Sequence, residues 1–247
     1  MLSNNAFYAF LRTTCLALVA FLASGAQSEA QIDRILAAHI PPVMIEGEDS
    51  SPGYAIEVLQ LASEVAGRKI DIEFLPIQRA IHELGNDKSS IFPSLFRTPA
   101  REDVYQWIAP LRTIDMHFIT LGDTPGNLDT ARKLGDIAVS AGGAPDAVLT
   151  DLGFENLVRV QNPDAAALML TNRRVDAWFT SSSVAGAFKS DNQDTTISPP
   201  IFKLSTFIAA HPDFPADAAQ EYRDALNKLR ANSALGEIAK KYNVDFD

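Results

Sequence analysis

Apolar and polar residues alternate along the first half of the chain in patterns that predict strands and helices in turn. Residues 54–66 carry apolar side chains at helical spacing, and Gly67 follows as a helix stop. The stretch KIDIEFL at 69–75 alternates strictly, which is typical of a strand. A strand at 35–38 precedes the helix, while IQRAIHELGN and SIFPSLF predict a second helix and a third strand. This β-α-β-α-β order predicts an α/β fold with a parallel sheet and helices on its faces.

The second half of the chain continues this alternation. We expect a short helix or turn over REDVYQWIAPL, which leads to Pro110, and then a strand at 116–121. Strand, Gly-Gly turn and helix follow in DIAVSAGGAPDAVLTDLGF, and NLVRVQ, PDAAALMLTNRR and VDAWFTSS continue the alternation. FKLSTFIAA predicts a late strand, and two amphipathic helices broken near 232–233 follow it. The pattern therefore predicts a second α/β set and a helical tail.

Two α/β sets of unequal size predict two lobes. In the simplest arrangement the chain leaves the first lobe near Ile119 and returns to it near Ser205. We expect 31–118 and 206–247 to form lobe one, and 119–205 to form lobe two. Paired crossings of this kind make a hinge, and hinged lobes frame ligand clefts.

The first 30 residues have the features of a cleavable secretory signal. Arg12 is their one basic residue, an apolar run follows at 15–23, and small residues lead to Ala26 and Ala30, either of which fits the cleavage site. The run is shorter than the about 20 apolar residues that a membrane span needs. The one cysteine, Cys15, lies in this segment, so the mature chain forms no disulfide. We expect export to the periplasm.

Composition and charge narrow the class of partner. About 217 residues remain after the signal, enough for one large or two small lobes. Hydrophobic residues make up 47% of the chain and charged residues 21%, as in soluble globular proteins. The formal net charge of −10 argues against nucleic acid and anionic membranes as partners. Local charge in a small pocket can still oppose this sign.

Two arginines bracket a Thr-Pro turn at the end of the predicted strand SIFPSLF. Arg97 and Arg101 lie where the open edge of an α/β sheet binds ligands. The planar fork of an arginine there matches a carboxylate, with backbone N–H groups as further donors. Alternatively, both arginines are surface charges paired with Glu102 or Asp103, because exposed ion pairs are common.

The motifs and their order favour the ligand interpretation. The segments GYAIEVLQLASEVAG, SLFRTPARE followed by WIAPL, RRVDAWFTSSSVAGAF and YRDALNKLRANSALGEIAKKY together resemble the type II periplasmic solute-binding proteins, in particular the polar amino-acid-binding group (bacterial extracellular solute-binding protein family 3) of ABC importers. The resemblance covers essentially the whole mature chain. It implies that the arginine of T-x-x-R, here Thr98 to Arg101, clasps the α-carboxylate of a ligand. It also maps Ser94 and Phe96 to the ligand site, and leaves the role of Arg97 open.

Two departures from the family pattern argue against an amino acid as the ligand. Where the family usually has G-T-T in the second lobe, this chain has Gly142, Gly143 and Ala144, so backbone N–H groups at a helix start remain but the hydroxyl is gone. Where the family has an acid for the α-ammonium, the aligned residue is Ser181. A buried ammonium without a carboxylate is poorly compensated. We therefore favour a small carboxylate or other anionic solute, with an amino-acid-like solute as an alternative.

Further candidates carry less information. By the resemblance, Arg79 begins a helix that faces the cleft, and a solvated surface arginine is the alternative. Tyr54 and Trp107 are candidates to line the pocket, although such rings more often belong to a core, as we expect for Trp178.

Metal and catalytic motifs are missing from the sequence. Its four histidines show no metal-ligand spacing, no Ser sits in a G-x-S-x-G elbow, and no P-loop or dinucleotide fingerprint is present. We expect no cofactor, no metal and no enzymatic activity.

The sequence thus predicts a monomeric, exported, two-lobe α/β binding protein. We expect it to capture a small anionic or amino-acid-like solute by closure of the lobes and to deliver it to an ABC permease in the inner membrane. One alternative is an exported enzyme on the same scaffold, similar to cyclohexadienyl dehydratases. Another is an accessory or sensory binding protein without a transporter.

Overall fold

A computed structural model of the chain describes residues 32–47, 51–191 and 194–246. They belong to one compact unit, Ile32–Asp247. The predicted secretory signal, with Cys15 in it, lies outside the described residues. In the described part of the chain no helix is long and apolar enough to cross a bilayer.

The first five elements confirm the predicted β-α-β-α-β order. They are β1 (Ile32–Ala37), α2 (Tyr54–Ala66), β2 (Lys69–Phe74), α3 (Ile77–Leu84) and β3 (Ser90–Phe96). β1 pairs in parallel with both β2 and β3. Gly67 ends α2 in the left-handed conformation, with φ of 70°, which glycine adopts without a steric penalty. The predicted helix stop is therefore confirmed.

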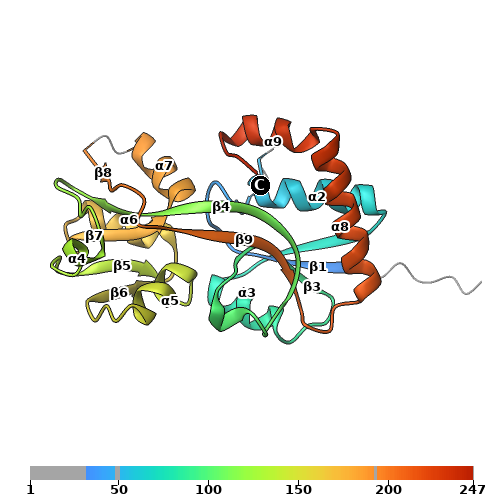
Figure 1. Ribbon diagram of the computed structural model, residues 1–247, viewed down its shortest axis with the longest axis horizontal. Coiled ribbons are helices and arrows are strands. Elements are labelled where there is room, and N and C mark those ends of the chain that lie inside the picture. Colours follow the sequence, from blue (N-terminus) through green and yellow to red (C-terminus); the bar gives the residue numbers. More distant parts are fainter. Residues whose placement is uncertain (1–31, 48–50, 192–193, 247) are drawn as a thin grey trace, which may run out of the picture. The chain divides into compact units, whose positions relative to one another are not determined.

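Two long antiparallel strands connect the two halves of the sheet. They are β4 (Gln106–Thr120) and β9 (Phe202–Ala210), which lie side by side in the middle of the molecule (Figure 1). The predicted helix or turn leading to Pro110 is wrong from Gln106 onward, because the strand begins there rather than at 116. Pro110 lies at a register shift between the two strands, where the missing N–H of a proline is tolerated.

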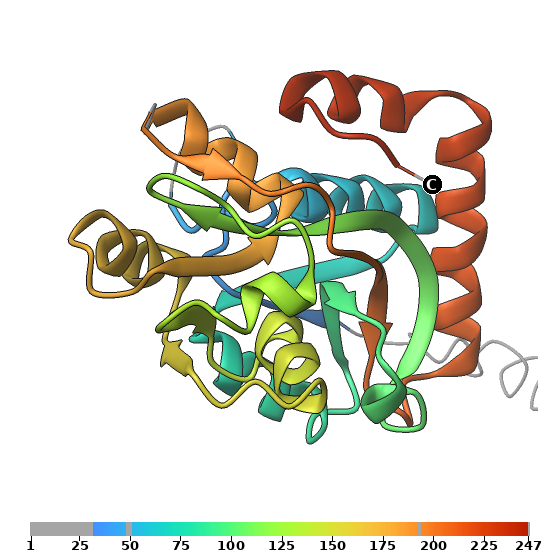
Figure 2. The same ribbon diagram turned by 60° about the vertical axis from the view of Figure 1, so that its left-hand side comes forward.

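The second group of elements also alternates. It contains α4 (Leu128–Ala131), β5 (Ile137–Ser140), α5 (Ala144–Asp151), β6 (Leu157–Val160), α6 (Pro163–Thr171), β7 (Ala177–Ser181), α7 (Ser182–Asp191) and the short β8 (Thr196–Ile197). The sequence patterns did not predict α7 or β8. Two tail helices, α8 (Ala216–Ala231) and α9 (Ala234–Tyr242), confirm the predicted break near 232–233. In Figure 2, α8 lies beside the curved β4.

All described strands form one mixed sheet. Its main path runs β2-β1-β3-β9-β4-β7-β5-β6, and β8 pairs with β4. β5 is parallel to β6 and to β7, whereas β7 is antiparallel to β4. The carboxyl ends of several parallel strands consequently become available on each side of the central pair β4 and β9.

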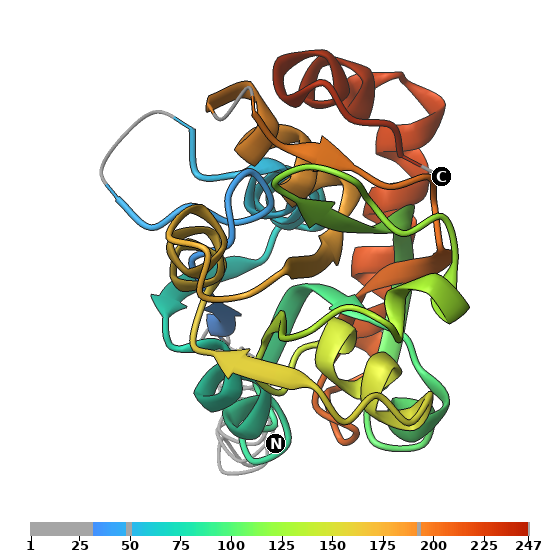
Figure 3. The same cartoon turned by 90° about the vertical axis from the view of Figure 1, so that its left-hand side faces the viewer.

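The apolar core is divided into three clusters. The largest joins β1 and β3 to α2, α3, α8 and α9. The other two lie on opposite faces of the β5–β7 half of the sheet, because successive strand residues alternate between them: Phe179 belongs to one and Trp178 to the other. α5 covers the first face and α6 and α7 the second, and Figure 3 shows α5 and α6 apart around β6. The lobe boundaries at 118/119 and 205/206 stay a prediction.

Candidate functional site

A cavity of about 350 Å³ opens at the carboxyl ends of the parallel strands. Residues that end or follow β1, β3, β5, β6 and β7 line it, as the ligand-binding edge of an α/β sheet predicts. Its volume is near the lower end of the about 300–1,000 Å³ typical of small-molecule pockets. The lining residues come from both groups of elements: Ala38, His39, Ile40, Glu46, Phe74, Leu75, Pro76, Ile77, Ile81, Phe92, Ser94, Leu95, Phe96, Arg101, Ser140, Gly143, Ala144, Pro145, Gln161, Asn162, Pro163, Thr180, Ser181 and Val184.

Arg101 is the cation among these lining residues. It ends the short 3₁₀ helix η1 (Pro99–Arg101) that follows β3. Its guanidinium donates hydrogen bonds to the carbonyl oxygens of Gly142 at 3.0 Å and Phe96 at 3.4 Å. Burial lowers the pKa of Arg101, and the phenol of Tyr105 opposes this effect. Arginine stays charged in proteins. Because no carboxylate in the described part of the chain pairs with it, an anion in the cavity would neutralise it.

Arg97 has a different environment, although it lies only four residues earlier. Its Nε donates to Glu102 at 2.7 Å, and the hydrogen bond to this carboxylate raises the pKa of Arg97. The guanidinium also lies over the rings of Trp107 and Phe207, at 5.4 Å and 4.9 Å from their centroids. Arg97 does not line the cavity. For Arg97, the structure shows the surface ion pair with Glu102 that the sequence offered as an alternative.

The loop before α5 faces Arg101 across the cavity. The N–H of Gly142 donates to Asp146 at 3.0 Å, and that of Gly143 donates to Ser140 at 3.0 Å. These two predicted donors are thus used within the loop. Helix starts leave further N–H groups without helical partners, and here the first is that of Ala144, which lines the cavity.

Gly142 brings the loop close to the opposite half of the molecule. Its φ is 68°, and a Cβ atom there would lie 3.1 Å from the side chain of Gln78 in α3. Together with the hydrogen bond from Arg101 to the Gly142 carbonyl, this contact joins η1 and α3 to the β5–α5 loop.

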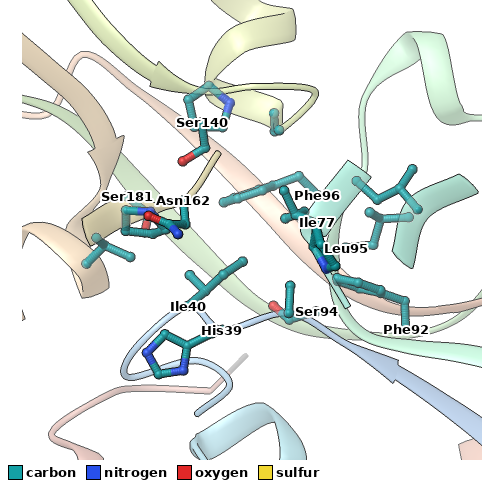
Figure 4. Close-up of a pocket in the computed structure, with 18 of the residues that line it drawn as sticks. His39, Ile40, Ile77, Phe92, Ser94, Leu95, Phe96, Ser140, Asn162 and Ser181 are labelled. Atoms are coloured by element: carbon teal, nitrogen blue, oxygen red, sulfur yellow. The ribbon is translucent and has the colours of Figure 1, made fainter. Parts of the chain in front are cut away.

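The two walls of the cavity differ in polarity. Figure 4 shows Phe92, Leu95 and Phe96 on one side, and Ser181 with Asn162 on the other. Five of the predicted site residues are brought together in this lining: Ser94, Phe96, Arg101, Gly143 and Ser181.

The other three predicted site residues do not line the cavity. Thr98 is buried beside η1, and its hydroxyl has no hydrogen-bond partner among the described residues. Tyr54 is buried in the largest core cluster, and this burial raises the pKa of its phenol. Arg79 is exposed on α3. Their roles in ligand binding stay predictions.

Sequence reasoning missed several lining residues. His39 and Ile40 follow β1, and Gln161 and Asn162 follow β6. The carboxyl-end rule that identified the loop after β3 would have found them if it had been applied to every strand.

Arg112 is a second arginine with no salt bridge among the described residues. It lies in β4, is 9% exposed, and donates to Ser183 Oγ in α7 at 3.2 Å. Its guanidinium also lies 5.4 Å from the ring centroid of Tyr54 in α2. This side chain therefore links β4 to one helix of each group of elements.

Comparison with known proteins agrees with this architecture. A family model described as bacterial extracellular solute-binding proteins, family 3, matches residues 34–245. No curated protein matched the chain.

Solved structures share the fold at low sequence identity. An ancestral arginine-binding protein bound to arginine has a TM-score of 0.77 and 17% identity, over 85% of this chain and 97% of that one. The GluR0 ligand-binding core from Nostoc punctiforme with (L)-glutamate has a TM-score of 0.74 and 16% identity, over 85% and 98%. A histidine kinase sensor domain with similarity to periplasmic binding proteins has a TM-score of 0.78 and 16% identity, over 87% and 96%. These likenesses confirm the predicted two-lobe fold class.

Proposed function

Because the chain belongs to family 3 of the bacterial extracellular solute-binding proteins, we propose that it captures a small carboxylate solute in the cavity beside Arg101. The observation that carries this proposal is a partly buried guanidinium that lines the cavity and has no carboxylate partner in the described part of the chain. A bound carboxylate would supply the missing negative charge and accept two parallel hydrogen bonds from the fork.

Closure of two lobes would accompany binding. In this proposal 31–118 with 206–247 forms one lobe and 119–205 the other, and β4 and β9 provide the two crossings. Arg101 and Ser94 belong to the first lobe, while Gly143 and Ser181 belong to the second. A ligand that contacts both sets of residues favours the closed arrangement, because only that arrangement makes all the contacts at once.

The proposal also includes export and delivery. A chain carrying a cleavable signal at its first 30 residues would work in the periplasm, where a membrane permease could recognise the closed form. The bound arginine and glutamate named for two structural neighbours support a small charged solute as ligand.

Isothermal titration calorimetry tests this function directly. The protein, freed of carried-over ligand by dialysis, is titrated with small carboxylates and, as matched controls, with the corresponding primary amides. We expect heat of binding from at least one class of carboxylate and none from its amide. A folded protein that binds no carboxylate, or binds amides equally well, contradicts the proposal.

A further inference from the structure

One wall of the cavity offers a ligand almost only apolar surface. Ile77 begins α3, and Phe92, Leu95 and Phe96 come from β3. Figure 4 shows these four side chains gathered on the same side. Phe92 and Leu95 are 1% and 2% exposed, so they are held in the core behind the wall, whereas Ile77 and Phe96 are half-buried and provide most of its exposed apolar surface. A polar solute would find few complementary contacts on this side beyond the hydroxyl of Ser94.

Charged groups are scarce in the rest of the lining. Besides Arg101, the cavity contains the ionisable side chains of His39 and Glu46. Glu46 is exposed, and its backbone N–H donates to Nδ1 of His39 at 3.0 Å. The remaining polar side chains on the lining are hydroxyl and amide groups. No buried carboxylate in the described part of the chain lines the cavity.

These two features select against an ammonium group on the ligand. An ammonium loses its hydration shell on burial, and neutral hydroxyls replace only part of that stabilisation. An alkyl or aryl group, in contrast, gains from contact with the apolar wall. Each buried methylene contributes about 0.8 kcal/mol, which is about fourfold in affinity.

We infer that the cavity takes an apolar monocarboxylate, an alkyl or aryl acid without an ammonium group, with its carboxylate at Arg101 and its body against the apolar wall that contains Ile77 and Phe96. This inference rests on the proposed function and specifies its substrate class.

Matched ligand pairs test the inference on the unaltered protein. 3-Phenylpropanoate and phenylalanine differ by one ammonium group, as do hexanoate and norleucine. We expect calorimetry to give at least a tenfold tighter dissociation constant for the acid of each pair. Along propanoate, butanoate, pentanoate and hexanoate we expect affinity to rise about threefold to fourfold per methylene.

Each other outcome has a distinct meaning. If the amino acid binds as tightly as its acid, or more tightly, the inference is overturned while the proposed function stands. If lactate or succinate binds more tightly than hexanoate, the inference that the ligand is apolar is overturned, while the proposed binding of carboxylates stands. If no carboxylate binds to the folded protein, both fail.

A substitution on the polar wall provides an independent test. Ser181 is 6% exposed and lines the cavity. Ser181→Asp adds the missing carboxylate, so we expect phenylalanine to gain at least tenfold relative to 3-phenylpropanoate. Ser181→Asn is the control for size, because Asn has nearly the shape of Asp but no charge. In this variant we expect the ratio of the affinities for 3-phenylpropanoate and phenylalanine to stay that of the unaltered protein. If the folded Ser181→Asp protein still prefers 3-phenylpropanoate to phenylalanine by the same factor, the neutral wall does not cause this preference and the inference is overturned. If this variant does not fold, the ligand pairs on the unaltered protein decide.

Discussion

Charged side chains at opposite ends of the parallel strands β1 and β3 have different kinds of partner. Near the amino-terminal end of β1, Asp33 is 0% exposed and accepts hydrogen bonds from Arg68 at 2.8 Å and Tyr222 at 2.7 Å. Burial, together with Asp33, raises the pKa of the Tyr222 phenol. Beyond the carboxyl end of β3, the guanidinium of Arg101 donates, among the described residues, only to carbonyl oxygens.

The difference separates a structural site from a binding site. A buried ion pair whose hydrogen bonds are all made needs nothing further, and losing one member leaves the other charged and unpaired. A guanidinium with neutral partners keeps unused attraction for an anion. The comparison therefore predicts that changes at the Asp33 end affect folding, whereas changes at the Arg101 end affect binding.

Loss of Asp33 should have the largest effect on stability. In Asp33→Ala the guanidinium of Arg68 loses its buried partner, so we expect the free energy of unfolding to fall by about 3–5 kcal/mol. Urea denaturation followed by circular dichroism measures it. The matched control is Glu221→Gln, because Glu221 also pairs with Arg68 but its side chain is 51% exposed; here we expect a loss below about 1 kcal/mol. Equal losses in the two variants would remove the distinction between the buried and exposed partners.

Replacement of Arg101 should affect ligand binding more than stability. In Arg101→Met the affinity for the tightest-binding carboxylate of the calorimetric panel should fall about 10-fold to 150-fold, because hydrogen bonds to charged groups contribute about 1.5–3 kcal/mol. The free energy of unfolding should fall less than in Asp33→Ala, because the substitution removes hydrogen bonds to the carbonyl oxygens of Phe96 and Gly142 but breaks no ion pair among the described residues.

Arg97→Met is the matched control for Arg101. Arg97 already pairs with Glu102 and lies outside the cavity. We expect a change in affinity below about twofold, because exposed ion pairs contribute little. A larger loss of affinity for Arg97→Met than for Arg101→Met would show that the anion binds Arg97, and our assignment to Arg101 would be wrong.

The regular part of the fold could be predicted from local patterns. Residues 54–66 and 69–74 show clean periodicity, and Gly67 separates them. The first part of β4 could not be predicted, because Pro110 interrupts the pattern and its pairing partner, β9, is distant in sequence. α7 begins with serines that also fit a loop, so its existence depends on packing against β4 and β7.

The arginine of the site was predicted where a sequence motif marks a strand end. The Thr98–Arg101 motif located Arg101, but it left the role of Arg97 open. The hydrogen-bond partners in the folded protein distinguish the two arginines. Arg97 donates to the carboxylate of Glu102, whereas Arg101 donates to the carbonyl oxygen of Gly142. His39 lies on a loop after β1 without any motif, which explains why it was missed.

Asp87 should give the smallest effect and show how partial exposure weakens an ion pair. It accepts hydrogen bonds from Ser89 Oγ at 2.7 Å and Arg34 at 3.0 Å, and its side chain is 30% exposed. Partial burial alone would raise the pKa of Asp87, but the hydrogen bonds from Ser89 and Arg34 hold it below the ordinary value of 3.8. Stabilisation is therefore present above that value and is lost as the pH falls through the lower, folded-state pKa.

Asp87→Asn tests this dependence through urea midpoints at neutral pH and in acid below the ordinary pKa. We expect the variant to lose less than about 1 kcal/mol at neutral pH, and the gap to the unaltered protein to narrow in acid, because protonation removes the same charge from Asp87. A gap that stays constant with pH would mean that shape, rather than charge, accounts for the loss. A loss as large as that of Asp33→Ala would show that burial does not rank these ion pairs, and the contrast between the Asp33 and Arg101 sites would then need another physical cause.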